Sequence, residues 1–220
     1  MENGLIYTPK REGFWSFDVG DGILDLLDTL LPVMTQDQSA TYFSQDGFST
    51  CTAPQFFLIG GKLHEMRNSE GDARKVAESA RQFIKQGIRG NLLNTQTRIS
   101  YSLDGQDTIT HDYGRANPVV NNVNLVGQDG LPEKVLSLET SLALTGKKPE
   151  EVGAIMSYLN ETQGYVWRFN SKPKNVAQDR VVRLFANSDR FLLNCYYRDP
   201  QNAKASFGVR LREKNKGGSH

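Results

Sequence analysis

Three stretches of the chain repeat apolar residues at helical spacing, which predicts three α-helices. They cover residues 23–34, residues from about 70 to 86, and a segment that begins at Pro149. Their apolar faces consist of Ile23, Leu26, Leu27, Leu30 and Met34 in the first stretch, Ala73, Val76, Ala77, Ala80 and Ile84 in the second, and Val152, Ile155, Met156 and Leu159 in the third. We expect these faces to point towards a core.

The second and third stretches also carry signals at their ends. Ser69 with Asp72 three residues later resembles a capping box, and Gly87 suits a C-terminal stop. Pro149 fits the first turn of a helix, and the two glutamates that follow it lie where the helix dipole favours negative charge. These signals favour helices at both places.

Most of the remaining chain alternates apolar and polar residues, which is typical of short strands. Residues 97–113 contain two alternating runs around Asp104-Gly105, a hairpin signal. The further strand candidates are QFFLIGG (55–61), VVNNVNLVG (119–127), YVWRFN (165–170), RVVRLF (180–185), RFLLNCYYR (190–198) and SFGVRLRE (206–213). The pattern predicts a mixed α+β fold with two or three helices and short antiparallel strands.

Alternation in residues 180–198 separates an inward from an outward set of side chains. The predicted inward set is Val182, Leu184, Phe191, Leu193, Cys195 and Tyr197. The predicted outward set is Arg183, Phe185, Arg190, Leu192, Asn194, Tyr196 and Arg198. Arginine, aromatic and asparagine side chains are typical of binding surfaces, although they also occur as cross-strand pairs on any exposed sheet face.

The overall composition is that of an ordinary globular protein, with 38% hydrophobic and 23% charged residues. Lysine and arginine total 26 against 25 aspartate and glutamate, a net charge of +1. This balance argues against a nucleic-acid-binding protein, in which excess positive charge supplies most of the affinity. Nucleic-acid binding through the basic segments KPKNVAQDRVVR and RLREKNK is therefore the least favoured function.

The first residues lack the apolar region of a secretory signal, and residues 22–34 are too short and too charged to span a membrane. We expect a cytoplasmic or virion-associated protein without membrane insertion. Two cysteines, Cys51 and Cys195, make no disulfide framework, and a single bridge between them stays open. Residues 1–216 are interpreted as one domain with an N-terminal elaboration, and residues 217–220 as a tag remnant.

Catalytic motifs are not evident. His64 and His111 have no metal-ligand spacing, and His220 lies in the tag, so we predict neither a metal nor another cofactor. The run LIGGK (58–62) lacks the spacing of a phosphate-binding loop. No GxSxG elbow is present, and neither cysteine has a histidine beside it in the sequence. A non-enzymatic function is favoured.

The last third of the chain resembles a known family. Arg180, Val181 and Arg183, then Tyr197 and Arg198, then Gly208, Val209 and Arg210 follow the order of the C-terminal strands in the C-type lectin fold of the formylglycine-generating-enzyme branch. The resemblance covers about residues 147–212 and implies a C-type lectin-like fold. The enzyme of that branch uses a pair of cysteines in this strand region, whereas this chain offers only Cys195, and the calcium-dependent sugar motifs of animal lectins are absent.

Within that fold, the segment is most similar to the variable proteins of diversity-generating retroelements. In that family adenine-directed mutation converts asparagine codons into a restricted set of residues on a fixed scaffold. Residues 184–200 contain no Lys, Glu, Gln, Met or Trp, which such codons ending in a pyrimidine cannot yield, whereas Gln201 and Lys204 break the pattern. The resemblance implies a variable ligand-binding region over about residues 180–212.

The resulting hypothesis is a non-enzymatic receptor-recognition protein for a protein or glycan on a host or neighbouring cell. Display on a larger particle such as a phage would raise avidity. The predicted ligand-binding residues are Arg183, Phe185, Asn187, Asp189, Arg190, Leu192, Asn194, Tyr196, Arg198, Gln201, Asn202 and Lys204. The alternative is an enzyme of the same fold that uses Cys195 as a reactive thiol.

Overall fold

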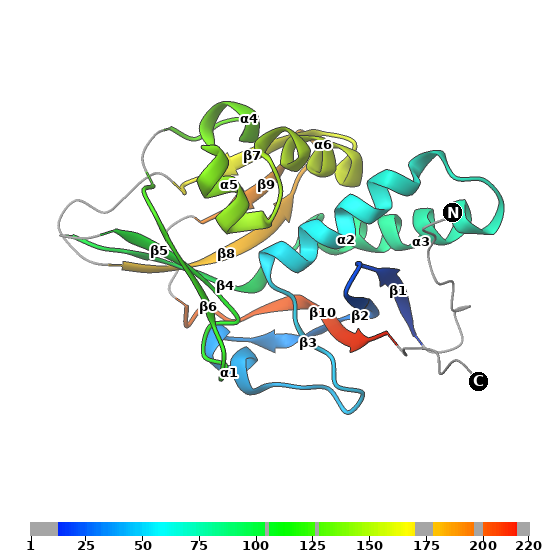
Figure 1. The fold of residues 1–220 in the computed structure, drawn as a ribbon, viewed down its shortest axis with the longest axis horizontal. Coiled ribbons are helices and arrows are strands. Elements are labelled where there is room, and N and C mark those ends of the chain that lie inside the picture. The colour runs from blue at the N-terminus through cyan, green and yellow to red at the C-terminus, as the bar shows by residue number, and fades with distance from the viewer. Residues whose placement is uncertain (1–12, 104–105, 126–127, 170–177, 196–199, 215–220) are drawn as a thin grey trace.

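The computed structural model describes residues 13–103, 106–125, 128–169, 178–195 and 200–214 (Figure 1). The described residues form ten strands, six α-helices and one 3-10 helix. The strands are β1 (Phe14–Asp18), β2 (Gly22–Met34), β3 (Ser49–Thr50), β4 (Leu93–Tyr101), β5 (Asp107–His111), β6 (Val119–Val123), β7 (Gln163–Trp167), β8 (Gln178–Ala186), β9 (Arg190–Asn194) and β10 (Lys204–Glu213). The helices are α1 (Gln36–Thr41), α2 (Ala53–Glu65), η1 (Met66–Asn68), α3 (Gly71–Ile88), α4 (Pro132–Val135), α5 (Leu138–Thr145) and α6 (Pro149–Asn160). The α+β class is confirmed, although the prediction of two or three helices was too low.

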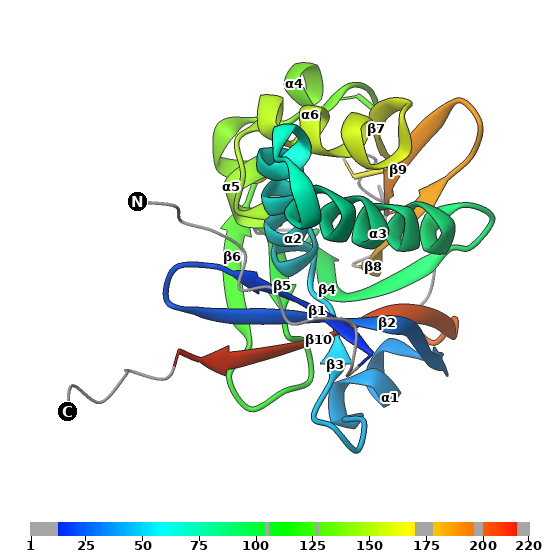
Figure 2. The ribbon, with the colours of Figure 1, turned by 90° about the vertical axis from the view of Figure 1, so that its right-hand side faces the viewer.

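The strands form two sheets. A four-stranded sheet has the order β1-β2-β10-β3, and a six-stranded sheet has the order β6-β5-β4-β8-β9-β7. In the first sheet β2 and β10 are antiparallel neighbours, so a strand from the N-terminal part of the chain lies beside its last strand. Figures 1 and 2 show α4, α5 and α6 gathered at one end of the molecule and the four-stranded sheet at the other.

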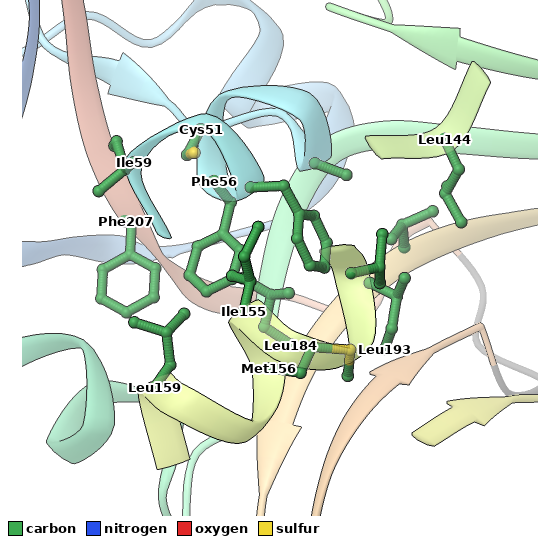
Figure 3. Close-up of a cluster of buried hydrophobic side chains, with 14 of the residues drawn as sticks. Cys51, Phe56, Ile59, Leu144, Ile155, Met156, Leu159, Leu184, Leu193 and Phe207 are labelled. Carbon is green, nitrogen blue, oxygen red and sulfur yellow. The ribbon is translucent and has the colours of Figure 1, made fainter. Parts of the chain in front are cut away.

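The core is built where the helices meet the inner sides of both sheets (Figure 3). Phe56 of α2 is central to it. Its ring stacks on Phe207 of β10, with centroids 5.8 Å apart, and meets Phe191 of β9 edge-on at 6.0 Å. One side chain of α2 therefore contacts both sheets, which holds them in a fixed relation.

Residues 23–34 are the strand β2, so the predicted helix is wrong. The strand is held between β1 and β10. Its carboxylate Asp25 is fully buried and accepts hydrogen bonds from Ser16 (2.7 Å), Arg210 (2.9 Å) and Arg212 (2.6 Å). Burial alone would raise the pKa of Asp25, but these three donors together hold it below its ordinary value. Partners from distant strands thus stabilise an extended backbone that local periodicity does not predict.

Pro32, near the C-terminal end of β2, is accommodated by an irregularity in the ladder. Met34 lies opposite Lys204 and Leu31 opposite Ser206, so two residues of β2, Pro32 and Val33, face one residue of β10. Such a bulge leaves a position that needs no ladder hydrogen bond, which suits a residue without an N–H group.

Residues 55–61, predicted as a strand, lie in the helix α2. Thr52 caps this helix: its hydroxyl accepts from the Gln55 N–H, and the Gln55 side chain accepts from the Thr52 N–H. The spacing of Thr52 and Gln55 is a capping-box signal that the aromatic run obscured. Gly60 allows α2 to approach α6 closely, because a Cβ there would lie 2.6 Å from the Ile155 methyl Cγ2.

The other two helices are confirmed as α3 and α6, with corrected ends. The N-cap of α3 is Glu70 and makes no side-chain hydrogen bond, so Ser69 and Asp72 do not form a capping box. Gly87 is not a stop but lies inside α3, where a Cβ would be 2.9 Å from the Phe207 ring. Close packing, rather than helix termination, explains this glycine.

The predicted strands from residue 97 onward are confirmed in the described regions. β4 and β5 form the predicted antiparallel hairpin, while its Asp104-Gly105 turn lies outside the described residues. One pair differs from the expectation of antiparallel strands, because β7 and β9 are parallel. After β7 the chain forms β8 and then β9, which lies between β8 and β7 in the sheet. β9 is antiparallel to β8 and parallel to β7.

Two further findings concern cysteines and membranes. Cys51 and Cys195 are both buried and free, so they do not form a disulfide bridge with each other. None of the helices in the described part of the chain combines the length and apolar character needed to cross a bilayer.

Candidate recognition surface

Three neighbouring strands, β8, β9 and β7, share an outer face that is partly exposed. Their registers place side chains in transverse rows, because residues opposite each other in a ladder point to the same face. Phe185, Leu192 and Tyr165 form one row, and Asn194 and Trp167 lie beside each other in the next. Arg190 follows at the hairpin end of β9. We call the following six residues the aromatic–arginine surface: Tyr165, Trp167, Phe185, Arg190, Leu192 and Asn194.

Alternation along β9 has the predicted sense in the described residues. Phe191 and Leu193 are fully buried and Cys195 is 1% exposed. Arg190 is exposed, and the neighbouring outward positions Leu192 and Asn194 are half-buried. Figure 3 shows Leu193 and Leu184 pointing into the core beside Met156 of α6. The predicted positions Tyr196, Tyr197 and Arg198 lie outside the described residues.

Two aromatic residues of β7 join this surface although the sequence interpretation did not include them. The Arg190 guanidinium lies 4.5 Å from the centre of the Tyr165 ring, a cation–π contact. Tyr165 and Trp167 have ring centres 6.1 Å apart. Both residues belong to the run YVWRFN, and they alternate with the buried Gly164, just before the run, and Val166 within it. The alternation of this run could have predicted that Tyr165 and Trp167 point away from the core. Their position next to β9 follows only from the sheet order.

Arg183 is not available to a ligand, which corrects its predicted exposure. It lies on the predicted face opposite Asn194, yet only 1% of it is exposed. Its Nε donates to Asn94 Oδ1 at 2.7 Å and its Nη2 to the Asn202 carbonyl at 3.2 Å. The segment that supplies this carbonyl is tied to α1 through a hydrogen bond from Gln36 N to the Pro200 carbonyl.

Asn187 and Asp189 lie in the exposed turn between β8 and β9. Asn187 shapes this turn, because its Oδ1 accepts hydrogen bonds from the backbone N–H groups of Asp189 (3.0 Å) and Arg190 (2.8 Å). Its side chain is thus engaged by the turn itself, in the manner of an Asx turn. Asp189 is exposed and accepts from Ser188 Oγ.

The remaining predicted positions lie beside α1 rather than on the aromatic–arginine surface. Gln201 is exposed and donates from Nε2 to Asp37 Oδ2 at 2.7 Å. Asn202 is half-buried and contributes its backbone carbonyl to the hydrogen bonds of Arg183. Lys204 is half-buried in β10 opposite Met34. The two groups of positions are joined through Arg183, which contacts Asn202 and pairs with Asn194.

A hollow of about 600 Å³ adjoins the aromatic–arginine surface at β7. It is lined by Gln128, Asp129, Gly130, Leu131, Lys134, Val135, Gln163 and Tyr165. Asp129 accepts a hydrogen bond from the Arg168 N–H at 2.6 Å, while Lys134 is exposed. Amide, cationic and apolar side chains therefore meet beside the Tyr165 ring, a mixture that suits binding of a polar or mixed group rather than a purely apolar one.

The Cys195 thiol is inaccessible and weakly acidic. It is buried, and this burial raises the pKa of Cys195 to about 12. At neutral pH the thiol is almost wholly protonated, whereas nucleophilic cysteines act as thiolates. Its geometry and charge state do not favour the alternative of a reactive cysteine.

His111 has a structural environment. Its Nε2 contacts the Ala143 carbonyl at 2.7 Å, and its Nδ1 contacts Thr97 Oγ1 at 2.9 Å. A carbonyl only accepts, so Nε2 carries the proton and Nδ1 accepts from the threonine hydroxyl. In the described residues no three His, Cys, Asp or Glu side chains are grouped so as to hold a metal ion.

Comparisons with protein-family models, with curated proteins and with solved structures found no match to this chain.

Proposed function

We propose that this protein is a non-enzymatic ligand-binding protein of C-type lectin-like fold, related to the variable proteins of diversity-generating retroelements. The aromatic–arginine surface on β7, β8 and β9 would contact a protein or glycan on another cell. The observation that carries the proposal is the alternation along β9. The buried residues Phe191 and Leu193 belong to the scaffold. The residues that alternate with them, Arg190, Leu192 and Asn194, face outward.

The composition of the surface supports recognition. Aromatic and arginine side chains give large contact areas at low entropic cost and are enriched among the residues that dominate binding energies. Tyr165 and Trp167 precede the proposed variable region of residues 180–212, so they would be a constant part of the surface. Phe185, Arg190, Leu192 and Asn194 would be its changeable part.

Three of the residues that carry the family resemblance, Arg180, Gly208 and Arg210, have scaffold roles, which also supports the proposal. Arg180 is buried, donates to the Arg168 carbonyl at 3.0 Å and lies 4.6 Å from the Tyr101 ring centre. At Gly208 a Cβ would lie 3.0 Å from Leu31 Cδ2. Arg210 pairs with the buried Asp25 carboxylate. A scaffold motif of this kind can stay fixed while neighbouring outward positions change.

The enzyme alternative rests on Cys195 and is disfavoured by its surroundings. A catalytic thiol needs access to substrate and a lowered pKa, and Cys195 has neither. Non-enzymatic recognition therefore remains the proposed function.

The proposal is tested by sequencing the 3′ coding region in many isolates of the source population. We expect amino-acid differences concentrated at positions 185, 190, 192 and 194, drawn from residues that mutated asparagine codons can encode. The matched control is the inward set at 184, 186, 191 and 193, which lies in the same DNA segment and should stay constant. Differences spread equally over both sets would contradict the proposal.

A further inference from the structure

Three of the four sheet edges in the described structure are protected in recognisable ways. Exposed edges invite pairing with other strands, and proteins usually block them by shortness, charge or cover. β7 is covered by the Gly130 segment, with Val166 N donating to the Gly130 carbonyl at 2.7 Å. β3 has only two residues, and β1 ends at Asp18, which pairs with Lys214.

The fourth edge, β6, has neither a charged residue nor a covering segment paired along it in the described part of the chain. Within the described part of the chain its one strand neighbour is β5. The strand is five residues long, and the sequence carries no charged residue from position 116 to position 128. Val119 and Val120 are 55% and 56% exposed. Pro118 precedes the strand and so does not interrupt its hydrogen-bonding groups.

The helix α5 adds apolar side chains beside this edge. It lies against β6 (Figure 1) and exposes Leu138 and Leu142, which are four residues apart on one helical face. A free backbone edge flanked by exposed leucine and valine is complementary to another neutral, apolar strand. The hydrogen-bonding requirement selects a strand as the occupant, and the lack of charge removes repulsion between identical edges.

We propose that β6 pairs antiparallel with β6 of a second copy of this chain, around a two-fold axis at Asn121. Such pairing is isologous, so Val119 meets Val123 and Val120 meets Asn122 on both sides of the axis. The two six-stranded sheets become one continuous sheet. Because β7 is at the opposite edge from β6, both copies keep their aromatic–arginine surfaces free. The inference goes beyond the proposed function and does not depend on it, although paired surfaces would raise avidity.

Sedimentation velocity of the full chain tests this pairing, at concentrations from about 1 to about 100 µM, the range of moderate affinities. We expect the mass to rise from the 24.6 kDa of one chain to twice that value. Val120→Lys places a charge at the edge and should weaken association at least about tenfold, since lysine is a common edge-blocking residue. The matched control is Val33→Lys, at a valine of the four-stranded sheet that is 67% exposed, which should dimerise like the wild type.

Hydrogen exchange distinguishes this interface from others. Amides of residues 119–123 should become better protected as concentration rises, with thermal melts confirming that both variants are folded. A wild-type chain that stays monomeric up to the highest concentration overturns the proposal and leaves the edge to a strand of another protein. Equal association of Val120→Lys and wild type, or concentration-dependent protection confined to other segments, also overturns it.

Discussion

Neighbouring arginines of the last strands have opposite roles, and their surroundings decide which. Arg183 is buried and hydrogen-bonded to Asn94 and Asn202, whereas Arg190 is exposed over the Tyr165 ring. Both are predicted to point outward by strand alternation, and both do lie on the same sheet face. Alternation gives the direction of a side chain. Burial of Arg183 depends on Asn94 and Asn202, which lie outside residues 180–198, so it cannot be predicted from that segment alone.

At the scale of single residues, His111 should make stability depend on pH. Burial is the main cause that lowers the pKa of His111, so the folded chain holds it neutral. In the unfolded chain it gains a proton below about pH 6.5, which favours unfolding. Its contribution is therefore complete above that pH and is lost as the pH falls towards the folded pKa.

Thermal melts between pH 7.5 and pH 5 measure this effect. The wild type should lose stability over this interval, and His111→Gln, which keeps one donor and one acceptor, should show a flatter profile. The control is His64→Gln: burial also lowers the pKa of His64, but this ring is only half-buried and should contribute less. Carboxylates such as Asp25 lose their contribution only below about pH 4.5, outside this window. Equal slopes for the wild type and His111→Gln would contradict the assignment.

At the scale of elements, local sequence patterns predicted a helix or strand correctly where the tertiary contacts favoured the same structure. α6, with Pro149 and two glutamates in its first turn, and the β4–β5 hairpin were predicted from short patterns. β2 was not, because leucines at helical spacing also fit a strand in which residues 22–26 are buried on both faces. α2 was missed although Thr52 and Gln55 mark its start. At α2 the capping signal was thus more informative than the aromatic content, whereas the Ser69–Asp72 signal before α3 was misleading.

The contact between α2 and α6 gives a prediction at this scale. At Gly60 a Cβ would lie 2.6 Å from Ile155 Cγ2, whereas at Gly61 the nearest atom is 3.4 Å away on the flexible Lys147 side chain. Gly60→Ala should cost about 1–3 kcal/mol through overpacking, reduced by the higher helix propensity of alanine. Gly61→Ala should be neutral or stabilise by up to about 1 kcal/mol. Urea denaturation of the two variants measures the contrast, and equal destabilisation would refute close packing at Gly60.

At the scale of the whole molecule, the fold places the proposed recognition surface and the proposed dimer edge on opposite sides of one sheet. The surface draws on β7, β8 and β9, which are separated in sequence by up to thirty residues and joined only by the sheet order. The strands β8 and β9 could therefore be predicted from the sequence, but the position of Tyr165 and Trp167 beside them could not. The core that supports this arrangement is shared by both sheets through Phe56.

The most direct measurement compares Leu193→Ala with Asn194→Ala, adjacent residues on opposite faces of β9. Leu193 is fully buried, so its truncation should cost about 2–5 kcal/mol of unfolding free energy. Asn194 lies on the opposite face and is half-buried, so its truncation should cost clearly less than that of Leu193. Chemical denaturation of both variants at neutral pH gives the two values. Destabilisation of similar size in both would contradict the division between scaffold and recognition positions.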